Sequence, residues 1–348
     1  MKSNLKKYIT LFILLLLSVV IASIHHTKLS QKKYYLSVVA IMKNEKPYLK
    51  EWLEYHLMQG VEHFYLCDND SSDNTKEYLT PYINQNIITY IPKPGKNQQL
   101  KCYEQVVKDY KDDTYWLAII DLDEYIVPII KNNIPSFLKE FEYASEVSLQ
   151  WMNYGDSNLF KRKDGLITET FTSHGGKLNH TVKSIVKPDK VIDFSIFGAN
   201  HYTRVEGLSV NEYHKPVSFM LSYHISADKA RINHYILKSF EEFVYKKKRG
   251  HPEGTSIDYE YYFYHNDNSV KNDKTMERFI KKLKKRMKKS PLKDIPHPIQ
   301  NLKENNFDEF YFTPTEASQV LNRSVDVPMS FYELEKKYKN KHPQYMSK

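Results

Sequence analysis

The sequence predicts an α/β protein built on a mostly parallel sheet with helices on both faces. In residues 34–120, short apolar runs rich in β-branched residues alternate with segments of helical spacing, which is typical of repeated βαβ units. The apolar runs are unbroken, and this indicates strands that are buried on both faces. A chain of 348 residues is long enough to bury such a core.

The first strand is predicted at Tyr34–Met42, whose residues YYLSVVAIM form one continuous apolar run. Pro47 then opens a helix that extends up to Gly60, because proline suits a first helical turn and glycine often follows the last one. The same criteria predict strands at His63–Cys67, Ile87–Ile91 and Tyr115–Ile120, and helices at Thr75–Tyr82 and Gln98–Tyr110.

The second half of the chain is less regular. Its predicted strands lie at Ala144–Trp151 and Thr181–Lys187, and a helix is predicted at Ala230–Lys248. Apolar residues from Met276 to Met287 recur at spacings of three and four, which indicates an amphipathic helix. From Pro291 onward frequent prolines favour loops, so residues 291–348 are expected to form a tail that wraps around the domain.

The N-terminus has the pattern of a membrane anchor. Lysines precede an apolar run from Tyr8 to Ile24, and about 17 residues is the lower limit for a helix that spans a bilayer. Residues 1–33 are therefore expected to be an uncleaved signal-anchor helix with a short stem, and a signal peptide cleaved near Val20-Ile21-Ala22 is the alternative. Lysines flank the run on both sides, so its orientation stays open.

The net charge of +9 is concentrated in one segment. Residues 276–289 hold eight Lys or Arg and one Glu, which leaves only +2 for the rest of the chain. We interpret this basic helix as a solvated face, with an anionic membrane surface or an acidic substrate as alternatives, and nucleic acid is not an expected partner. Cys67 and Cys102 are expected to be buried thiols, and one disulfide is the alternative if the domain is lumenal.

Three polar segments follow predicted strands and carry the candidate chemistry. Side chains alternate along an extended segment, so Asp121 and Asp123 of the DLDE motif project from one face. Paired carboxylates suit Mg²⁺ or Mn²⁺, which keep positions open for phosphate oxygens, and an acidic strand end that caps a turn is the alternative. Asp68 ends the second strand and can accept hydrogen bonds from a nucleobase or a ribose. These two segments and the KNE segment at residues 43–45 are expected to converge, because carboxyl ends of parallel strands meet at one edge.

Four motifs occur together in VVAIMKNEKPYLKEWLEYHLMQGVEHFYLCDNDSSDNT and WLAIIDLDEYIVP: K-N-E, E-W-x-x-Y-H, D-N-x-S-x-D and D-x-D-E-[FY]. This combination resembles glycosyltransferase family 92 and the wider GT-A group that includes family 2, over roughly residues 36–285. The usual D-x-D-E-F of the family is D-L-D-E-Y in this chain, which keeps the aromatic position. The resemblance implies a GT-A fold for residues 34–290, with a nucleotide-sugar half at 34–130 and an acceptor half at 131–290.

The resemblance also implies a metal-dependent enzyme that moves a sugar from a nucleotide-sugar, expected to be a UDP-sugar, to a glycan or other hydroxyl acceptor by an inverting single displacement. It places contacts to the sugar donor at Asn44, Glu45, Asp68 and Asp121. Metal contacts fall at Asp121 and Asp123, with Mn²⁺ or Mg²⁺ as the cation. We expect the third metal ligand to be His234, or else His201, and we expect Lys183 and Arg249 to face the diphosphate.

The general base must come from the acceptor half. Asp156, Glu169 and Asp193 qualify by residue type, and Asp156 is preferred because it follows the aromatic WMNYG segment. Trp151 and Tyr154 of that segment are expected to stack on a sugar or to belong to the core. Galactose is the best-known sugar of the family, so a hexosyltransferase, and among these a galactosyltransferase, is implied, but no residue selects the sugar.

The anchor implies a single-pass membrane protein. Its expected location is the Golgi or another endomembrane with a lumenal catalytic domain in a eukaryote, and the cell membrane in a bacterium. Two other functions stay open. A metal-dependent nucleotidyltransferase would also use paired acids, although the glycine- and lysine-rich phosphate loop usual in such enzymes is absent after Met42. A non-catalytic, membrane-associated binding protein would depend on the basic helix instead.

Overall fold

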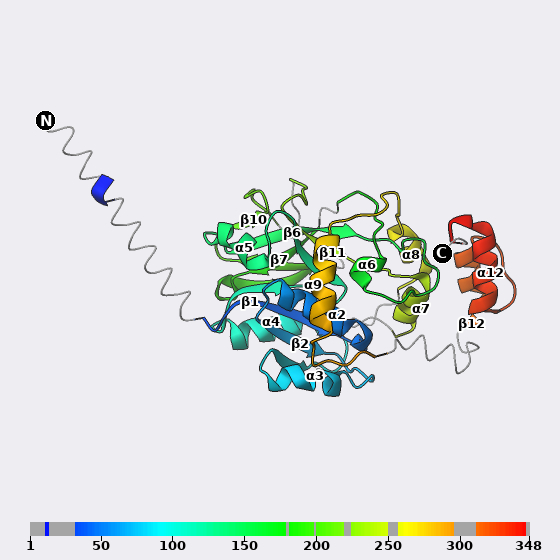
Figure 1. Cartoon of the computed structure of the whole chain (residues 1–348), viewed down its shortest axis with the longest axis horizontal. Helices are drawn as coiled ribbons and strands as arrows, with labels where there is room; N and C mark the ends of the chain where they lie inside the picture. Colours follow the sequence, from blue (N-terminus) through cyan, green and yellow to red (C-terminus); the bar gives the residue numbers. More distant parts are fainter. Residues whose placement is uncertain are drawn as a thin grey trace.

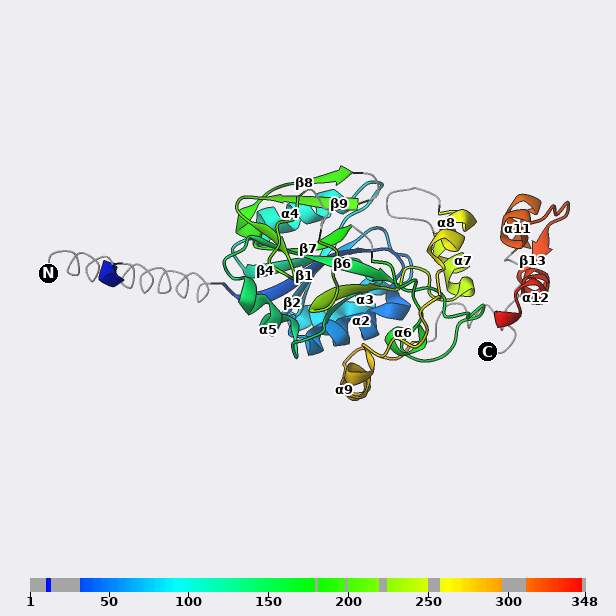
Figure 2. The same cartoon turned by 90° about the horizontal axis from the view of Figure 1, so that it is seen from above.

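The computed structural model describes residues 11–13, 32–178, 181–197, 200–218, 224–249, 257–295 and 311–345. A nine-stranded sheet forms its centre, with helices on both faces (Figure 1, Figure 2). The strands of this sheet are β1 (Tyr34–Met42), β2 (His63–Asp68), β3 (Ile88–Pro92), β4 (Thr114–Ile119), β5 (Glu124–Pro128), β6 (Glu146–Asn153), β7 (Val182–Val186), β10 (Ser209–Asn211) and β11 (Ala230–His234). The helices are α2 (Lys46–Met58), α3 (Thr75–Asn84), α4 (Gln99–Tyr110), α5 (Ile134–Leu138), α6 (Ile167–Thr170), α7 (Phe240–Arg249), α8 (Tyr259–His265), α9 (Glu277–Met287), α11 (Pro314–Leu321) and α12 (Phe331–Lys341).

The first half of the sheet has the predicted parallel arrangement. Its strand order is β3-β2-β1-β4, and each neighbouring pair is parallel. The second half is mixed, because β7 runs antiparallel to both β4 and β6, and β11 runs parallel to β6 but antiparallel to β5. The α/β prediction is therefore confirmed, and the sheet is mixed, with its antiparallel pairs confined to the second half.

Both faces of the parallel half are covered. In β1, Val38 packs on the side of α2 and Val39 on the side of α4, and both are fully buried. The hairpin of β8 (Val191–Phe197) and β9 (Asn200–Val205) lies over α4, on the face opposite α2 (Figure 2). This explains why the strand run is apolar without alternation.

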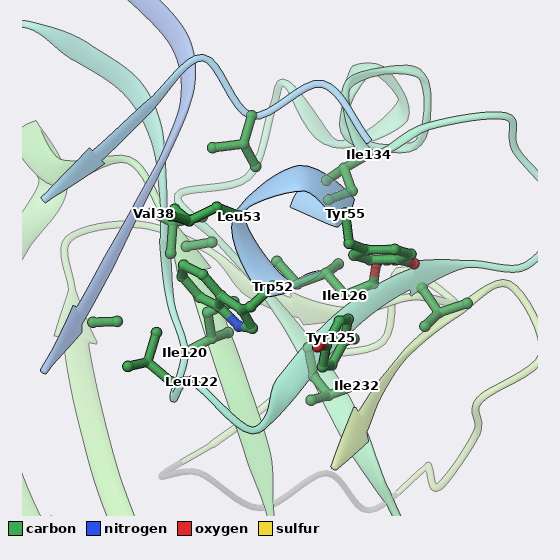
Figure 3. Close-up of a cluster of buried hydrophobic side chains, with 14 of the residues drawn as sticks. Val38, Trp52, Leu53, Tyr55, Ile120, Leu122, Tyr125, Ile126, Ile134 and Ile232 are labelled. Atoms are coloured by element: carbon green, nitrogen blue, oxygen red, sulfur yellow. Dashed lines mark hydrogen bonds between the residues drawn. The ribbon is translucent and has the colours of Figure 1, made fainter. Parts of the chain in front are cut away.

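Helix α2 packs against the strand that follows the acidic motif (Figure 3). The indole nitrogen of Trp52 donates a hydrogen bond to the carbonyl oxygen of Glu124 at 2.8 Å, which ties the helix to the start of β5. Ile120 and Leu122 lie beside Trp52 in the core, at 0% and 4% exposure. The expected extended segment is a turn at Leu122 and Asp123, where the N–H of Glu124 donates to the carbonyl oxygen of Asp121 at 3.1 Å. Asp121 and Asp123, on either side of the buried Leu122, are only partly buried.

Two secondary-structure predictions are wrong. Residues 230–248 are not one helix, because β11 occupies 230–234 before α7 begins at Phe240. Pairing with β6 on one side and β5 on the other overrides the weak helical pattern of the segment. The tail after residue 291 is not all loop, since it contains α11 and α12 and a two-stranded sheet of β12 (Tyr311–Phe312) and β13 (Met329–Ser330). Aromatic residues of this tail pack with α7 and α8 in a second core.

The expectation of buried thiols is also wrong. Cys67 of β2 and Cys102 of α4 form a disulfide, which links α4 to the sheet. The predicted membrane anchor at Tyr8–Ile24 lies outside the described residues, apart from positions 11–13. In the described part of the chain, no helix has the length and apolar character needed to cross a bilayer.

Candidate functional site

The three polar segments meet at one edge of the sheet, as predicted. Parallel pairing sets Met42 opposite Asp68 and Val39 opposite Ile119, so β1, β2 and β4 all end at this edge. The first two segments are also joined directly, since the backbone N–H of Ser72 donates to Oδ1 of Asn44 at 2.7 Å. The segments after these strands are therefore parts of one site.

Asp68 holds the second segment in shape. Its Oδ1 accepts from the backbone N–H of Ser71 at 2.9 Å, and its Oδ2 accepts from the hydroxyl of Tyr90 at 2.5 Å. Asn44 adopts a left-handed backbone conformation with φ of 51° and interlocks with the same segment. Both residues thus fix the backbone at the ends of β1 and β2, and their contact with a nucleotide stays a prediction.

Asp121 and Asp123 each pair with a lysine from another element. Oδ2 of Asp121 lies 2.7 Å from Nζ of Lys183 on β7, and Oδ2 of Asp123 lies 2.8 Å from Nζ of Lys246 on α7. Burial alone would raise the pKa of Asp123, but the charges of Lys246 and His234 hold that pKa well below its usual range. Asp123 is therefore ionised at neutral pH, and each of the two carboxylates lies against a lysine.

Glu124 adds a third acidic group behind the pair. It is fully buried, and its Oε1 lies 3.5 Å from Nζ of Lys183. Burial raises the pKa of Glu124 to about 7, with Lys183 opposing this shift and Asp121 reinforcing it. Burial would lower the pKa of Lys183, but Asp121 and Glu124 raise it above its ordinary value. Lys183 therefore keeps its charge between two carboxyl groups.

His234 is placed beside Asp123 by the sheet. Strand β11 runs between β5 and β6, with His234 opposite Glu124 on one side and Asn153 on the other. Nδ1 of His234 lies 3.1 Å from Oδ1 of Asn153, and because an amide oxygen can only accept, Nδ1 is the donor. Nε2 then faces Oδ1 of Asp123 at 3.5 Å.

The residues at this edge fit a divalent cation in type and orientation. With Nδ1 bound to Asn153, Nε2 of His234 and the carboxylate of Asp123 face each other, and an imidazole nitrogen and a carboxylate oxygen are both common ligands of metal ions. The bond from Nδ1 to Asn153 is the kind that orients metal-binding histidines. In the part of the chain that the structure describes, no three His, Cys, Asp or Glu side chains form a ready metal site, and Asp121 is paired with Lys183 instead.

Two lysines at the site were not anticipated. Lys246 lies on α7, and Lys238 lies in the turn before it, with Nζ 4.4 Å from the centre of the Tyr48 ring. Burial lowers the pKa of Lys238, while Asp123 and Glu45 counteract that shift. Both lysines fell in a segment predicted as one long helix, where nothing in the sequence distinguished them from surface lysines.

The three proposed bases lie in other surroundings. Asp156 is fully buried. Its carboxylate accepts hydrogen bonds from five donors of the described residues, which are the backbone of Asn158 and the side chains of Tyr262, Asn266, Asn268 and Tyr345. Glu169 of α6 forms an exposed ion pair with Lys284, and Asp193 of β8 pairs with Arg204. These contacts do not involve Asp121 or Asp123.

Trp151 and Tyr154 have different environments. Trp151 is partly exposed at the site, with its ring 5.1 Å from the ring of His234. Tyr154 is buried, stacks on Tyr235 at 4.7 Å and donates to Asp273, so it belongs to the core. The side chains of the remaining predicted residues, His201 and Arg249, lie outside the described part of the structure.

The fold and this site together define an α/β protein with two aspartates, each paired with a lysine, at the carboxyl ends of parallel strands. A family model described as glycosyltransferase family 92 matches residues 32–289. The chain belongs to glycosyltransferase family 92.

Curated relatives carry the same family name. A glycosyltransferase family 92 protein of Arabidopsis thaliana is 26% identical over 194 residues, which cover 52% of this chain and 33% of the relative. A family 92 protein of Oryza sativa subsp. japonica is 23% identical over 219 residues, which cover 61% of this chain and 35% of the relative. The chain thus matches about a third of the length of these relatives.

Solved structures are only distantly similar. The S. aureus TarS 1–349 structure in complex with UDP is 14% identical, with a TM-score of 0.29 and coverage of 44% of this chain and 47% of that one. A likeness this weak supports no inference about this chain.

Proposed function

We propose that this protein is a glycosyltransferase that moves a sugar from a nucleotide-sugar to a hydroxyl group of an acceptor, a glycan for example. The observation that carries the proposal is the acidic pair Asp121 and Asp123, at the carboxyl ends of parallel strands and next to Lys183, Lys246 and His234. Family membership supports the same class of reaction and disfavours a nucleotidyltransferase.

In this proposal the parallel half of the sheet binds the nucleotide. Asn44, Glu45 and Asp68 line the ends of β1 and β2, where a nucleoside diphosphate binds in open α/β sheets. Asp121, Asp123 and His234 would hold Mn²⁺ or Mg²⁺. When bound, such a cation supplies positive charge that neutralises the departing diphosphate.

The protein's own residues position the sugar donor. Lys183 and Lys238 are buried lysines beside the acidic residues. Their positive charges are already in position for phosphate oxygens, so no reorganisation of water or protein is needed when the diphosphate binds. Trp151 offers an aromatic surface next to His234 on which an apolar sugar face can stack. The reaction expected from the family is an inverting displacement, in which a base removes the acceptor proton.

The disulfide supports a proposal about the compartment of the domain. A bond between Cys67 and Cys102 persists in oxidising surroundings and is rare in a reducing cytosol. We therefore propose an extracytoplasmic or lumenal compartment for the folded domain. Alkylation of the protein extracted from its native cells tests this, because a domain exposed to the cytosol would show two modified cysteines.

The test of the activity is a screen of nucleotide-sugars with the full-length protein in detergent. Release of a nucleoside diphosphate from one sugar donor, in the presence of Mn²⁺ and lost on addition of EDTA, is the expected result. Asp123→Asn should abolish turnover, whereas Asp112→Asn, whose side chain is 87% exposed on a different loop, should not. Absence of turnover with every nucleotide-sugar and a range of glycan acceptors would contradict the proposal.

A further inference from the structure

Lys246 is attached to the acidic pair from outside the sheet. Its Nζ donates to Oδ2 of Asp123 at 2.8 Å and to the carbonyl oxygen of Ile236 at 3.2 Å. Helix α7 is fixed by its first turn, where Ser239 and Glu242 exchange hydrogen bonds between backbone and side chain in both directions. The backbone of Lys246 is thus fixed by the helix, while its long side chain reaches the carboxylate of Asp123.

The pair formed by Lys246 and Asp123 is largely removed from water, with 18% and 12% of the two side chains exposed. A charge in such surroundings is strongly destabilised when its partner leaves. Lys246 can therefore move away from Asp123 only toward another anion. A phosphate group is such an anion, and the compact ammonium of lysine on a flexible stem suits it.

We propose that Lys246 is an exchangeable counter-ion of the sugar-donor site: it neutralises Asp123 in the free protein and moves onto the diphosphate of the nucleotide-sugar when a divalent cation occupies the acidic pair. The inference rests on the proposed function, since it takes a nucleoside diphosphate and a divalent cation as ligands. The physical reason is competition, because the ammonium already holds an oxygen of Asp123 that the cation requires.

The other two lysines of the site do not share this property. Lys183 is 5% exposed in its side chain and lies between two acids, since Glu124 is 3.5 Å from it in addition to Asp121. Lys238 rests on the Tyr48 ring. Both lysines keep their partners when Asp123 exchanges Lys246 for a divalent cation, so they remain in place.

A coupling between the two ligands follows. Nucleotide and divalent cation both favour the state in which Lys246 has left Asp123, so each should strengthen binding of the other by the same factor. Without the lysine, no ammonium group competes with the cation for the carboxylate of Asp123. The diphosphate, in turn, loses one positively charged group that would bind it. The two affinities should then move in opposite directions.

The experiment uses full-length protein in detergent and two probes, Mn²⁺ and UDP. Free Mn²⁺ is titrated by electron paramagnetic resonance with and without saturating UDP. For the wild type we expect UDP to tighten Mn²⁺ binding about tenfold or more. For Lys246→Met we expect tighter binding of Mn²⁺ alone, weaker binding of UDP, and a coupling factor smaller than that of the wild type, because only the direct attraction between cation and diphosphate remains.

The matched control is Lys247→Met. Lys247 is the next residue on α7 and pairs with Glu316 at 2.8 Å, away from the acidic pair. This variant should behave as the wild type in both titrations. If Lys246→Met binds Mn²⁺ no more tightly than the wild type, or keeps the full coupling, the inference is wrong while the transferase proposal stands. If the wild type binds neither probe, both are wrong.

Loss of Lys246 can also weaken the fold, because it leaves Asp123 ionised in a mostly buried position. A thermal shift measurement turns this into a second test. Mn²⁺ alone should raise the melting temperature of Lys246→Met more than that of the wild type, because it binds the folded variant more tightly. Lys246→Gln keeps a polar N–H donor on a side chain one atom shorter, without the charge, and should give the same ordering. An equal or smaller shift in both variants would overturn the inference.

Discussion

Nδ1 of His234 donates a hydrogen bond to Oδ1 of Asn153 at 3.1 Å, across two neighbouring parallel strands. The bond selects one tautomer of the imidazole and directs Nε2 toward Asp123. The uncharged side chain of Asn153 thus controls the orientation of His234, a candidate metal ligand. Several outcomes can be predicted from this and from related contacts.

Asn153→Ala should weaken Mn²⁺ binding about ten- to a hundredfold, because the histidine loses the partner that fixes its tautomer and orientation. The measurement is a titration of Mn²⁺ in the presence of UDP. Asn84→Ala, an exposed asparagine at the end of α3, is the matched control and should leave the affinity unchanged. Equal affinities for the wild type and Asn153→Ala would show that His234 needs no such support.

Asp156→Asn should destabilise the protein by about 2 to 4 kcal/mol, because an amide cannot accept from all the donors that surround a buried carboxylate. Those donors include Tyr345 from the C-terminal tail, so chemical unfolding should also detach the tail earlier. Activity per folded molecule should stay within about threefold of the wild type. A loss of about a hundredfold or more in a folded variant would instead identify Asp156 as the general base.

Removal of the disulfide should lower stability. Cys67 and Cys102 close a segment with a sequence separation of 35, and a crosslink of that kind stabilises a fold by about 2 to 4 kcal/mol. The Cys67→Ala, Cys102→Ala double variant should unfold at a lower denaturant concentration than the oxidised wild type. Reducing agent should destabilise the wild type and leave the double variant unaffected. No difference between the two proteins would mean that α4 is held to the sheet by packing alone.

His63 should make stability fall in acid. Burial lowers the pKa of His63 to about 4, from 6.5 in its ordinary state, so the unfolded chain binds an extra proton between these values. The contribution of neutral His63 to the free energy of unfolding is fully present above pH 6.5. Below that pH it should decline by about 1.4 kcal/mol per pH unit until the pH reaches the folded pKa.

The measurement is the free energy of unfolding of the wild type and of His63→Gln, each at pH 7 and at pH 5.5. The comparison is needed because burial raises the pKa of Glu51 and Glu146, and their protonation favours the folded state as the pH falls. The wild type should lose more stability than the variant over this range. Parallel losses would mean that His63 does not titrate differently in the folded protein.

The parallel half of the fold could be predicted from the sequence because its signals are local. An unbroken apolar run such as Tyr34–Met42 indicates a strand covered on both faces, and β1 has those bounds. The convergence of the segments at residues 43–45, 68–75 and 121–124 followed from strand direction alone. The helices of the tail were also within reach, since Thr313 with Glu316 and Ser330 with Glu333 form capping boxes that the prolines obscured.

The rest depends on contacts between distant segments. Residues 230–234 form a strand only because β5 and β6 lie on either side, and this tertiary pairing also brings His234 to Asp123. Lys246 and Asp123 are separated by 123 positions, and Asp156 and Tyr345 by 189. Spacing along the chain carries no signal for such pairs, so residue type alone could not show that Asp156 is buried among hydrogen-bond donors.

The most direct test of the whole account is calorimetric titration of UDP into the full-length protein, with and without Mn²⁺, for the wild type and Asp123→Asn. We predict that the wild type binds UDP much more tightly with Mn²⁺ present, and that Asp123→Asn loses this enhancement while remaining folded. If the two proteins bind UDP with the same affinity in Mn²⁺, the acidic pair is not the site of the nucleotide diphosphate and the account is wrong.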